Sequence, residues 1–168
     1  MQRIMIIGSP GSGKSTLARA LADRLDLPVH HMDHIHWHPG WVERDAADKM
    51  VLVRQVIAGD RWVFEGGHSS SYEDRLARAD LLIWLDLPMG LRLWRVIRRS
   101  LRDLGQVRPD MQQGCPEQLS NLPGFIRFIW TSNRSSRARA HRVFDAAHIP
   151  RRRFRRPRDV NTYLDRLT

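Results

Sequence analysis

A glycine-rich segment near the start of the chain carries residues suited to phosphate chemistry. Residues 8–15 read GSPGSGKS and match the pattern G-x-x-x-x-G-K-[ST] at every fixed position. In such a loop the glycines let successive backbone N–H groups face phosphate oxygens, and the following helix adds its N-terminal dipole. We therefore expect a nucleoside triphosphate to bind here. The predicted nucleotide-binding residues are Gly8, Ser9, Pro10, Gly11, Ser12, Gly13, Lys14, Ser15 and Thr16.

Two side chains at the end of this loop have predicted roles of their own. Lys14 should reach the β- and γ-phosphates, and the hydroxyl of Ser15 should bind Mg²⁺. A hard cation of this kind prefers oxygen ligands and commonly accompanies ATP. The expected cofactors are therefore ATP and Mg²⁺.

Carboxylates follow two further predicted strands. Asp33 ends the second strand and Glu65 ends the third. Because ligands bind at the carboxyl ends of parallel strands, both acids should face the same crevice as the glycine-rich loop. We assign Asp33 to the deprotonation of an acceptor hydroxyl, since an aromatic segment follows it, and Glu65 to the metal. Asp86, which follows the apolar run of residues 81–85 in the fourth strand, is equally compatible with a metal role and with a turn before Pro88.

Arginines form the other candidate cluster. Arg95 and Arg99 are four residues apart, so they share one face of a helix predicted over residues 91–104. Two guanidinium groups directed at a triphosphate would stabilise the charge of the transferring phosphoryl group. Residues 105–124 are rich in Gly and Pro and have the length of a lid, and Arg108 within them could close over the nucleotide.

Five histidines fall between residues 30 and 38. His34, His36 and His38 alternate and could share one strand face, as zinc ligands do. No cysteine accompanies them, and phosphate chemistry favours oxygen ligands. We favour a lining role for these histidines, together with Trp37 and Trp41, in a pocket for the acceptor, and metal binding by the cluster stays open.

The positions of apolar residues predict alternating strands and helices, which indicates an α/β fold with a parallel sheet. A break of the helix over 125–148 is expected at Ser132–Asn133, and the last strand is unusual because four of its five residues are arginine. The predicted strands span 3–8, 29–32, 62–64, 81–87 and 151–155, and the predicted helices span 15–25, 45–58, 72–79, 91–104, 125–148 and 159–167.

Length and charge limit the possible classes. The 168 residues fit a single domain, 1–168, with a lid and arginine-rich segment at about 98–145. The formal charge is +10, and residues 91–168 hold 18 arginines against 6 acids. Such asymmetry suits phosphate handling or nucleic-acid binding. No apolar run reaches about 18 residues, and the N-terminus has no signal pattern, so we expect a cytoplasmic protein without a membrane span. The one cysteine, Cys115, excludes an intrachain disulfide.

Six stretches of the chain resemble adenylate-kinase-like nucleoside and nucleotide kinases, and more narrowly the small bacterial proteins described as DNA topology modulation or adenylate-kinase-related proteins. The resemblance extends to about residue 145. The matching stretches are RIMIIGSPGSGKSTL (3–17), LPVHHMDHIHWHPGW (27–41), DRWVFEGG (60–67), RADLLIWLDLP (78–88), LWRVIRRSLRDL (93–104) and RPDMQQGC (108–115).

The resemblance implies a three-layer fold with a five-stranded parallel sheet in the order 2-3-1-4-5. It also implies that Arg95 and Arg99 contact the nucleotide base and phosphates and that Arg158, after the last strand, lies near the base. The sequence departs from the family after the third strand, where Glu65-Gly66-Gly67-His68 replaces the expected Asp-Gly-x-Tyr.

Taken together, these features favour an ATP·Mg²⁺-dependent phosphotransferase that acts on a small-molecule, nucleoside or nucleotide acceptor. The acceptor is expected near Asp33, Trp37, Gly66 and His68, and Lys14, Asp33, Arg95 and Arg99 are the predicted catalytic residues. The alternatives are a nucleotide-dependent DNA- or RNA-binding regulator with weak hydrolysis, and a bare NTPase. The acceptor, the preference for ATP over GTP and the oligomeric state stay open.

Overall fold

The computed structural model describes residues 1–167. Its centre is a sheet of five parallel strands, all running in the same direction. The strands are β1 (Arg3–Gly8), β2 (Val29–His31), β5 (Trp62–Glu65), β6 (Leu81–Leu85) and β7 (Arg151–Phe154). Their order across the sheet is β2-β5-β1-β6-β7, which is 2-3-1-4-5 when these strands are counted along the chain. The predicted fold class and sheet order are confirmed.

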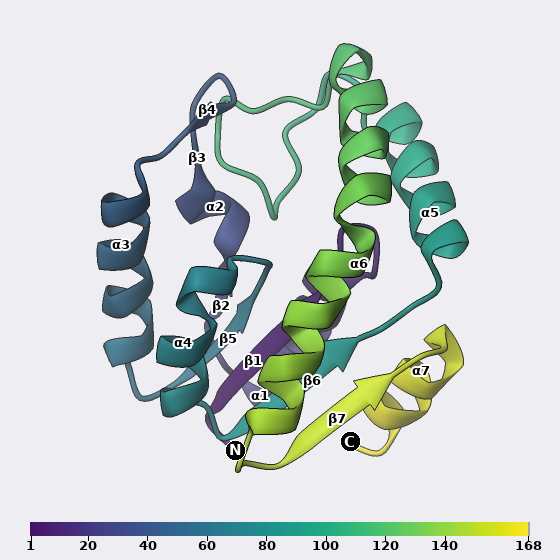
Figure 1. Ribbon diagram of the computed structural model, residues 1–168. Helices are drawn as coiled ribbons and strands as arrows, with labels where there is room; N and C mark the ends of the chain where they lie inside the picture. Colours follow the sequence, from purple (N-terminus) through teal and green to yellow (C-terminus); the bar gives the residue numbers. More distant parts are fainter. Residues whose placement is uncertain (168) are drawn as a thin grey trace.

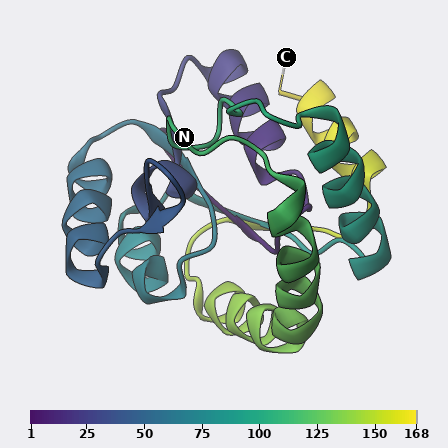
Figure 2. The same ribbon diagram turned by 90° about the horizontal axis from the view of Figure 1, so that it is seen from above.

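Helices cover both faces of this sheet (Figures 1 and 2). The three central strands, β1, β5 and β6, are apolar on both faces, as buried parallel strands usually are. One face packs against α3 (Ala46–Ala58), α4 (Tyr72–Arg78) and α6 (Leu122–Ala146), and the other packs against α1 (Lys14–Leu25) and α7 (Pro157–Asp165). Along β1 the side chains alternate, with Met5 and Ile7 on the first face and Ile4 and Ile6 on the second.

The remaining elements lie at the carboxyl end of the sheet. They are α2 (Met32–His36), the small hairpin of β3 (Trp37–His38) and β4 (Val42–Glu43), the 3₁₀ turns η1 (Ser69–Ser71) and η2 (Leu119–Asn121), and α5 (Met89–Arg102). The segment between α5 and η2 returns toward α2 and the hairpin (Figure 1). Among residues 1–167, no helix has both the length and the hydropathy needed to cross a bilayer.

Two expectations about local structure are wrong. Helix α6 is continuous through Ser132–Asn133, and the hydroxyls of Thr131 and Ser132 bond carbonyls one turn back, so they do not compete for the N–H groups of the helix backbone. His34, His36 and His38 do not share a strand face, since the first two lie on α2 and only His38 is in a strand.

The arginine-rich last strand is real and lies at the sheet edge. An edge strand needs only one ladder, so its other side can face water. Phe154 reaches the core, and the guanidinium of Arg153 lies 4.1 Å from the centre of the Trp84 ring.

Candidate functional site

The glycine-rich loop joins the end of β1 to the start of α1, as its sequence predicts. Gly13 caps α1 with φ +90°, and Gly11 has φ +76°. A Cβ on Gly11 would lie 2.4 Å from the carbonyl oxygen of Arg92, so helix α5 packs directly against the loop. Ser12 Oγ is buried without a hydrogen-bond partner in the described chain. An orphaned hydroxyl in a ring of backbone N–H groups suits a phosphate oxygen.

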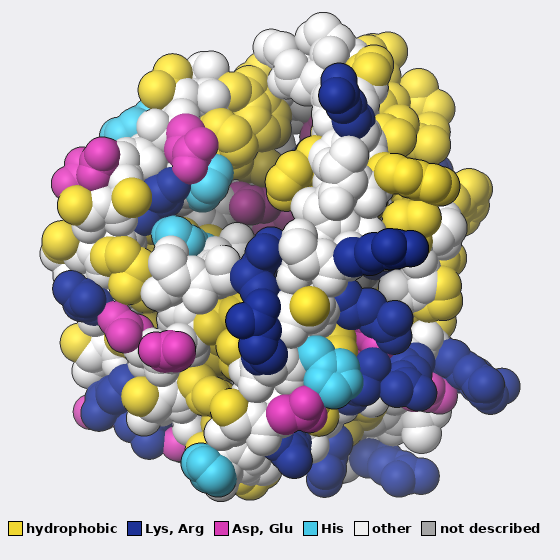
Figure 3. Space-filling view, viewed as in Figure 1, with side chains coloured by type: hydrophobic (Ala, Val, Ile, Leu, Met, Phe, Trp, Pro, Cys, Tyr) yellow, Lys and Arg dark blue, Asp and Glu magenta, His cyan; other side chains and the backbone are white. Residues whose placement is uncertain are grey.

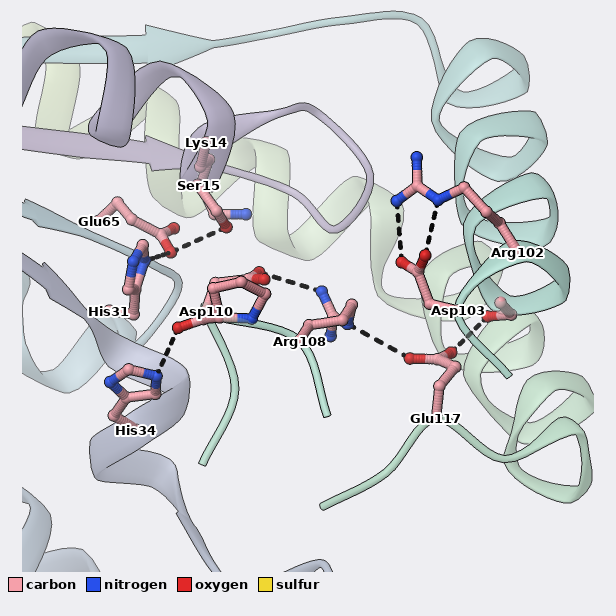
Figure 4. A network of polar contacts seen from close by, with 12 residues as sticks. Lys14, Ser15, His31, His34, Glu65, Arg102, Asp103, Arg108, Asp110 and Glu117 are labelled. Atoms are coloured by element: carbon pink, nitrogen blue, oxygen red, sulfur yellow. Dashed lines mark hydrogen bonds and ion pairs between the residues drawn. The ribbon is translucent and has the colours of Figure 1, made fainter. Parts of the chain in front are cut away.

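Glu65 lies beside this loop and is almost completely buried. It ends β5, which pairs in parallel with β1, so its carboxylate reaches the first turn of α1. Ser15 Oγ donates a hydrogen bond to Glu65 Oε1 over 3.0 Å, and His31 Nδ1 lies 2.8 Å from the same oxygen (Figure 4). Burial alone would raise the pKa of Glu65, but the His31 hydrogen bond and the charge of Lys14 hold it below its usual value. Glu65 is thus an ionised carboxylate next to Ser15.

Asp33 lies in the first turn of α2 rather than at the end of a strand, because β2 already ends at His31. Burial raises the pKa of Asp33 to about 6, and the negative charge of Glu65 contributes. The positive charges of Lys14 and Arg108 oppose this shift. Asp33 therefore shares the electrostatic environment of the glycine-rich loop and titrates near neutral pH, which is a property of general bases.

Helix α5 directs two of its arginines toward the loop. Arg95 Nη1 lies 3.5 Å from the carbonyl oxygen of Ser12. A Cβ added to Gly13 would lie 3.5 Å from the same nitrogen, so this arginine lies over the loop. Arg99 Nε is buried without a partner in residues 1–167, and burial lowers the pKa of this guanidinium. A buried N–H that lacks an acceptor is suited to an anionic ligand. Arg95 and Arg99 thus lie on the side of α5 that faces the loop and the segment after α5.

Residues 103–118, which we call the return loop, bring in Arg108, which the sequence singled out, together with two acidic side chains that it did not. Arg108 Nη1 lies 3.0 Å from Asp110 Oδ2, and Arg108 Nε lies 3.4 Å from Glu117 Oε2 (Figure 4). Asp110 is buried. Burial raises its pKa, but the charge of Arg108, together with the nearby hydroxyl of Ser15, holds it below its usual value. A second ionised carboxylate therefore approaches Ser15 from the loop predicted to be a lid.

The return loop is docked on α2 and the hairpin. His34 Nε2 lies 3.1 Å from the carbonyl oxygen of Pro109, and Trp41 Nε1 donates to the carbonyl oxygen of Pro116 over 3.0 Å. The N–H of Gly40 bonds the carbonyl oxygen of Gly114 over 2.9 Å. These contacts place the loop across the hollow between the hairpin and α6, at the bottom of which acidic side chains are visible in Figure 3.

The residues expected to bind the acceptor come from α2, from the hairpin and from the segment that follows β5. Trp37 contacts the rings of His36 and Trp41 edge-on. Gly66 has φ +123°, and a Cβ there would lie 2.3 Å from Met32 Cβ. His68 Nδ1 lies 2.9 Å from Ser70 Oγ, and burial, followed by the charge of Lys49, lowers the pKa of His68 to about 4. His68 is therefore a neutral, polar side chain at neutral pH.

Two other predicted nucleotide-binding residues lie on the surface of helices. Arg158 is exposed at the start of α7, with its neighbour Asp159 as the nearest acid at 3.7 Å. Thr16 is exposed on α1. In the described part of the chain no three His, Cys, Asp or Glu side chains converge as metal ligands would. Two protein oxygens, from Ser15 and Glu65, fit Mg²⁺ because this ion usually takes few protein ligands and completes its shell with phosphates and water.

The sequence grouped His31 with the other histidines and did not indicate its contact with Glu65, and it gave no role to Asp110. His31 adjoins Glu65 only because β2 and β5 pair with His31 opposite Glu65. Asp110 follows Arg108 and Pro109 in the return loop. Its only signal in the sequence is that it is a carboxylate within the predicted lid.

Known proteins share parts of this sequence and all of this architecture. Residues 4–56 match the family described as ATPase family associated with various cellular activities (AAA). The cytidylate kinase of Halobacterium salinarum is 31% identical over 118 residues, which cover 58% of this chain and 58% of that protein. The chain thus spans little more than half the length of this curated relative.

Solved structures of shikimate kinases share the fold of the whole chain. The enzyme from Acinetobacter baumannii superimposes with a TM-score of 0.59 at 18% identity, covering 99% of this chain and 90% of that one. The enzyme from Bacteroides thetaiotaomicron gives a TM-score of 0.56 at 19% identity, covering 99% and 95%. With the glycine-rich loop and the 2-3-1-4-5 sheet, these comparisons confirm that the chain has the fold of the adenylate-kinase-like P-loop kinases.

Proposed function

We propose that the chain is an ATP·Mg²⁺-dependent phosphotransferase that acts on a small acceptor. The observation that carries this proposal is the meeting of three groups at the carboxyl edge of the sheet. They are the Lys14–Ser15 end of the glycine-rich loop, the ionised Glu65, and Asp33 with its pKa near 6. A phosphate-binding loop alone would serve any NTPase, whereas a separate carboxylate that titrates near neutral pH suits the activation of an acceptor.

On the donor side, Ser15 and Glu65 would hold Mg²⁺, which neutralises phosphate charge when it is bound. Lys14 and the backbone N–H groups of the loop would bind the β- and γ-phosphates. Arg95 and Arg99 approach from α5, and the unpartnered Arg99 Nε supports a contact with a phosphate oxygen. Arg108 would exchange its partner Asp110 for the transferring phosphoryl group, because both are anions that fit its guanidinium.

On the acceptor side, Asp33 would accept the proton of an acceptor hydroxyl. As the bond between that oxygen and the γ-phosphorus forms, the bond from this phosphorus to the β–γ bridging oxygen breaks, and ADP leaves. A hydroxyl needs such a base, whereas a phosphate acceptor is already ionised at neutral pH. The raised pKa of Asp33 therefore favours a hydroxylated small molecule over a nucleoside monophosphate.

The names of the similar proteins suggest both acceptor classes for a test. ADP release from ATP·Mg²⁺ should be measured against cytidylate and other nucleoside monophosphates, nucleosides, shikimate and other hydroxylated acids. Lys14→Ala should remove activity with every acceptor, because the β- and γ-phosphates lose their cation. Asp33→Asn should lower kcat about 10²-fold or more with a hydroxyl acceptor.

Each outcome has a defined meaning. Stimulation by a hydroxylated compound that both variants lose supports the proposal and identifies the acceptor. Stimulation by a nucleoside monophosphate that Asp33→Asn retains would keep the kinase assignment and reject the role of Asp33. A flat panel, with only slow hydrolysis that depends on Lys14, would reject the phosphotransferase.

A further inference from the structure

A row of basic residues on α6 is not used by the proposed reaction. Arg127, Trp130, Arg134, Arg137 and His141 are spaced three or four residues apart, so they form one stripe along the helix. All five side chains are exposed. Trp130 is 64% exposed although its side chain is large and mainly apolar. At 1.5 Å per residue the row is about 21 Å long. We call it the α6 basic row.

The C-terminal part of this row, from Arg134 to His141, lines a groove beside the ends of β6 and β7. The groove consists of two adjoining hollows of about 340 and about 650 Å³, and both are lined by Arg137 and Arg155. Arg134, Arg142 and Arg153 line the larger one. Figure 3 shows these basic side chains spaced down α6 and gathered where its lower half meets β7.

The positive charge of the groove is only partly neutralised. Asp86 is the one acid among the lining residues, and its side chain is 7% exposed. It pairs with Arg137 at 2.9 Å and with Arg153 at 2.6 Å. This pairing replaces the metal role considered for Asp86. Neither Arg134 nor Arg142 has an ion pair within residues 1–167, and at the end of the row His141 pairs with Asp145.

We propose that the α6 basic row and its groove bind single-stranded nucleic acid. Exposed arginine guanidinium groups match the phosphate oxygens of a nucleic-acid backbone. Because the row contains no acidic residue, none of its members repels the negatively charged phosphates. Trp130 offers an open ring between Arg127 and Arg134, and bases stack on such rings only when they are not already stacked in a duplex. The combination of cations with an exposed aromatic ring favours a single strand over a duplex.

The α6 basic row and the larger hollow contain no residue of the glycine-rich loop, whereas the smaller hollow adjoins this loop through Ser9. Arg92, which also lines the smaller hollow, donates to the carbonyl oxygens of Leu87 over 3.1 Å and of Pro10 over 3.4 Å, and it also bonds Asn133. Arg95 and Arg99 lie farther along α5 and do not line either hollow. Substitutions at Trp130, Arg134 and Arg142, which do not line the smaller hollow, therefore test strand binding without altering the glycine-rich loop.

The test is fluorescence anisotropy of a labelled 12-nucleotide oligothymidylate in 50–300 mM NaCl. The double variant Arg134→Gln/Arg142→Gln removes two cations that have no ion pair, so Asp86 keeps its partners. For single strands the slope of log K against log salt changes by about 0.7 per phosphate contact, so the variant should lose about 1.4 of the slope and about 25-fold in affinity at 0.1 M salt. Trp130→Ala should weaken binding about fivefold or more.

Two controls separate the groove from other causes. Arg19→Gln/Arg24→Gln removes the same charge from exposed positions on α1. It should lower the affinity for the oligonucleotide less than Arg134→Gln/Arg142→Gln does. Lys14→Ala should bind the oligonucleotide like the unchanged protein, even if the kinase proposal fails. The inference is overturned if the unchanged protein shows no salt-dependent binding at 50 mM NaCl, if both arginine pairs lower the affinity equally, if Lys14→Ala abolishes binding, or if a duplex of the same length binds more tightly.

Discussion

Replacing Asp33 with Asn should make the nucleotide-free, metal-free protein more stable at pH 8. The pKa of Asp33 is raised by burial from 3.8 to about 6, so the folded protein binds this proton more tightly than the unfolded chain. The ionised carboxylate therefore lowers the free energy of unfolding, and this destabilisation has its full size above about pH 6. It disappears as the pH falls toward 4. A shift of about two pH units at about 1.4 kcal/mol per unit sets a ceiling of about 3 kcal/mol.

Urea unfolding of both proteins in EDTA at pH 4.5, 6, 7 and 8 measures this difference. We expect Asp33→Asn to gain up to about 3 kcal/mol at pH 8 and little at pH 4.5, because an amide of the same shape carries no charge to bury. The same variant should lose phosphoryl transfer, and in the unchanged protein kcat/KM should fall about tenfold per pH unit below pH 6, where Asp33 becomes protonated.

Asp80→Asn is a matched control with the opposite sign. Burial would raise the pKa of Asp80, but its hydrogen bond with Arg3 prevails and lowers it to about 2. This carboxylate therefore stabilises the fold above about pH 4 and loses that effect as the pH falls through about 2. Because its side chain is 30% exposed, solvent screens the pair, and the variant should lose only about 1 kcal/mol at pH 8. An Asp33→Asn protein that is no more stable than the original at pH 8, or equally more stable at pH 4.5, would refute the reasoning.

Three other substitutions test the site. Glu65→Gln should raise the Mg²⁺ concentration needed for half-maximal ADP release about tenfold or more, because the proposed metal site loses its charged ligand. An unchanged Mg²⁺ titration contradicts this. Gly66→Ala should cost about 2 kcal/mol or more in a urea melt, since its Cβ would overlap Met32; wild-type stability would disprove the clash. Asp110→Asn should lower the KM for ATP by freeing Arg108, and a higher KM would show that Asp110 assists binding.

Local patterns in the sequence identify one half of the site because that half is contiguous. The glycine-rich loop, its Lys14 and its Ser15 fall within eight residues between a strand and a helix, so the motif predicts their arrangement without any long-range contact. The alternation of strands and helices likewise predicts the α/β class. The order of the strands was inferred from the family resemblance, since spacing along the chain does not determine which strands pair.

The other half depends on strand pairing and on the path of the return loop. Glu65 lies 50 residues from Ser15 and 34 from His31, and they meet because β5 pairs with both β1 and β2. Asp110 reaches Ser15 through the docking of a loop that has no periodic pattern to predict its path. Asp86 became a partner of arginines from α6 and β7 rather than a metal ligand. The sequence by itself thus determined the fold class and the phosphate-binding loop, whereas only the tertiary structure decided the environment of each distant carboxylate, because burial and neighbouring charges set its pKa.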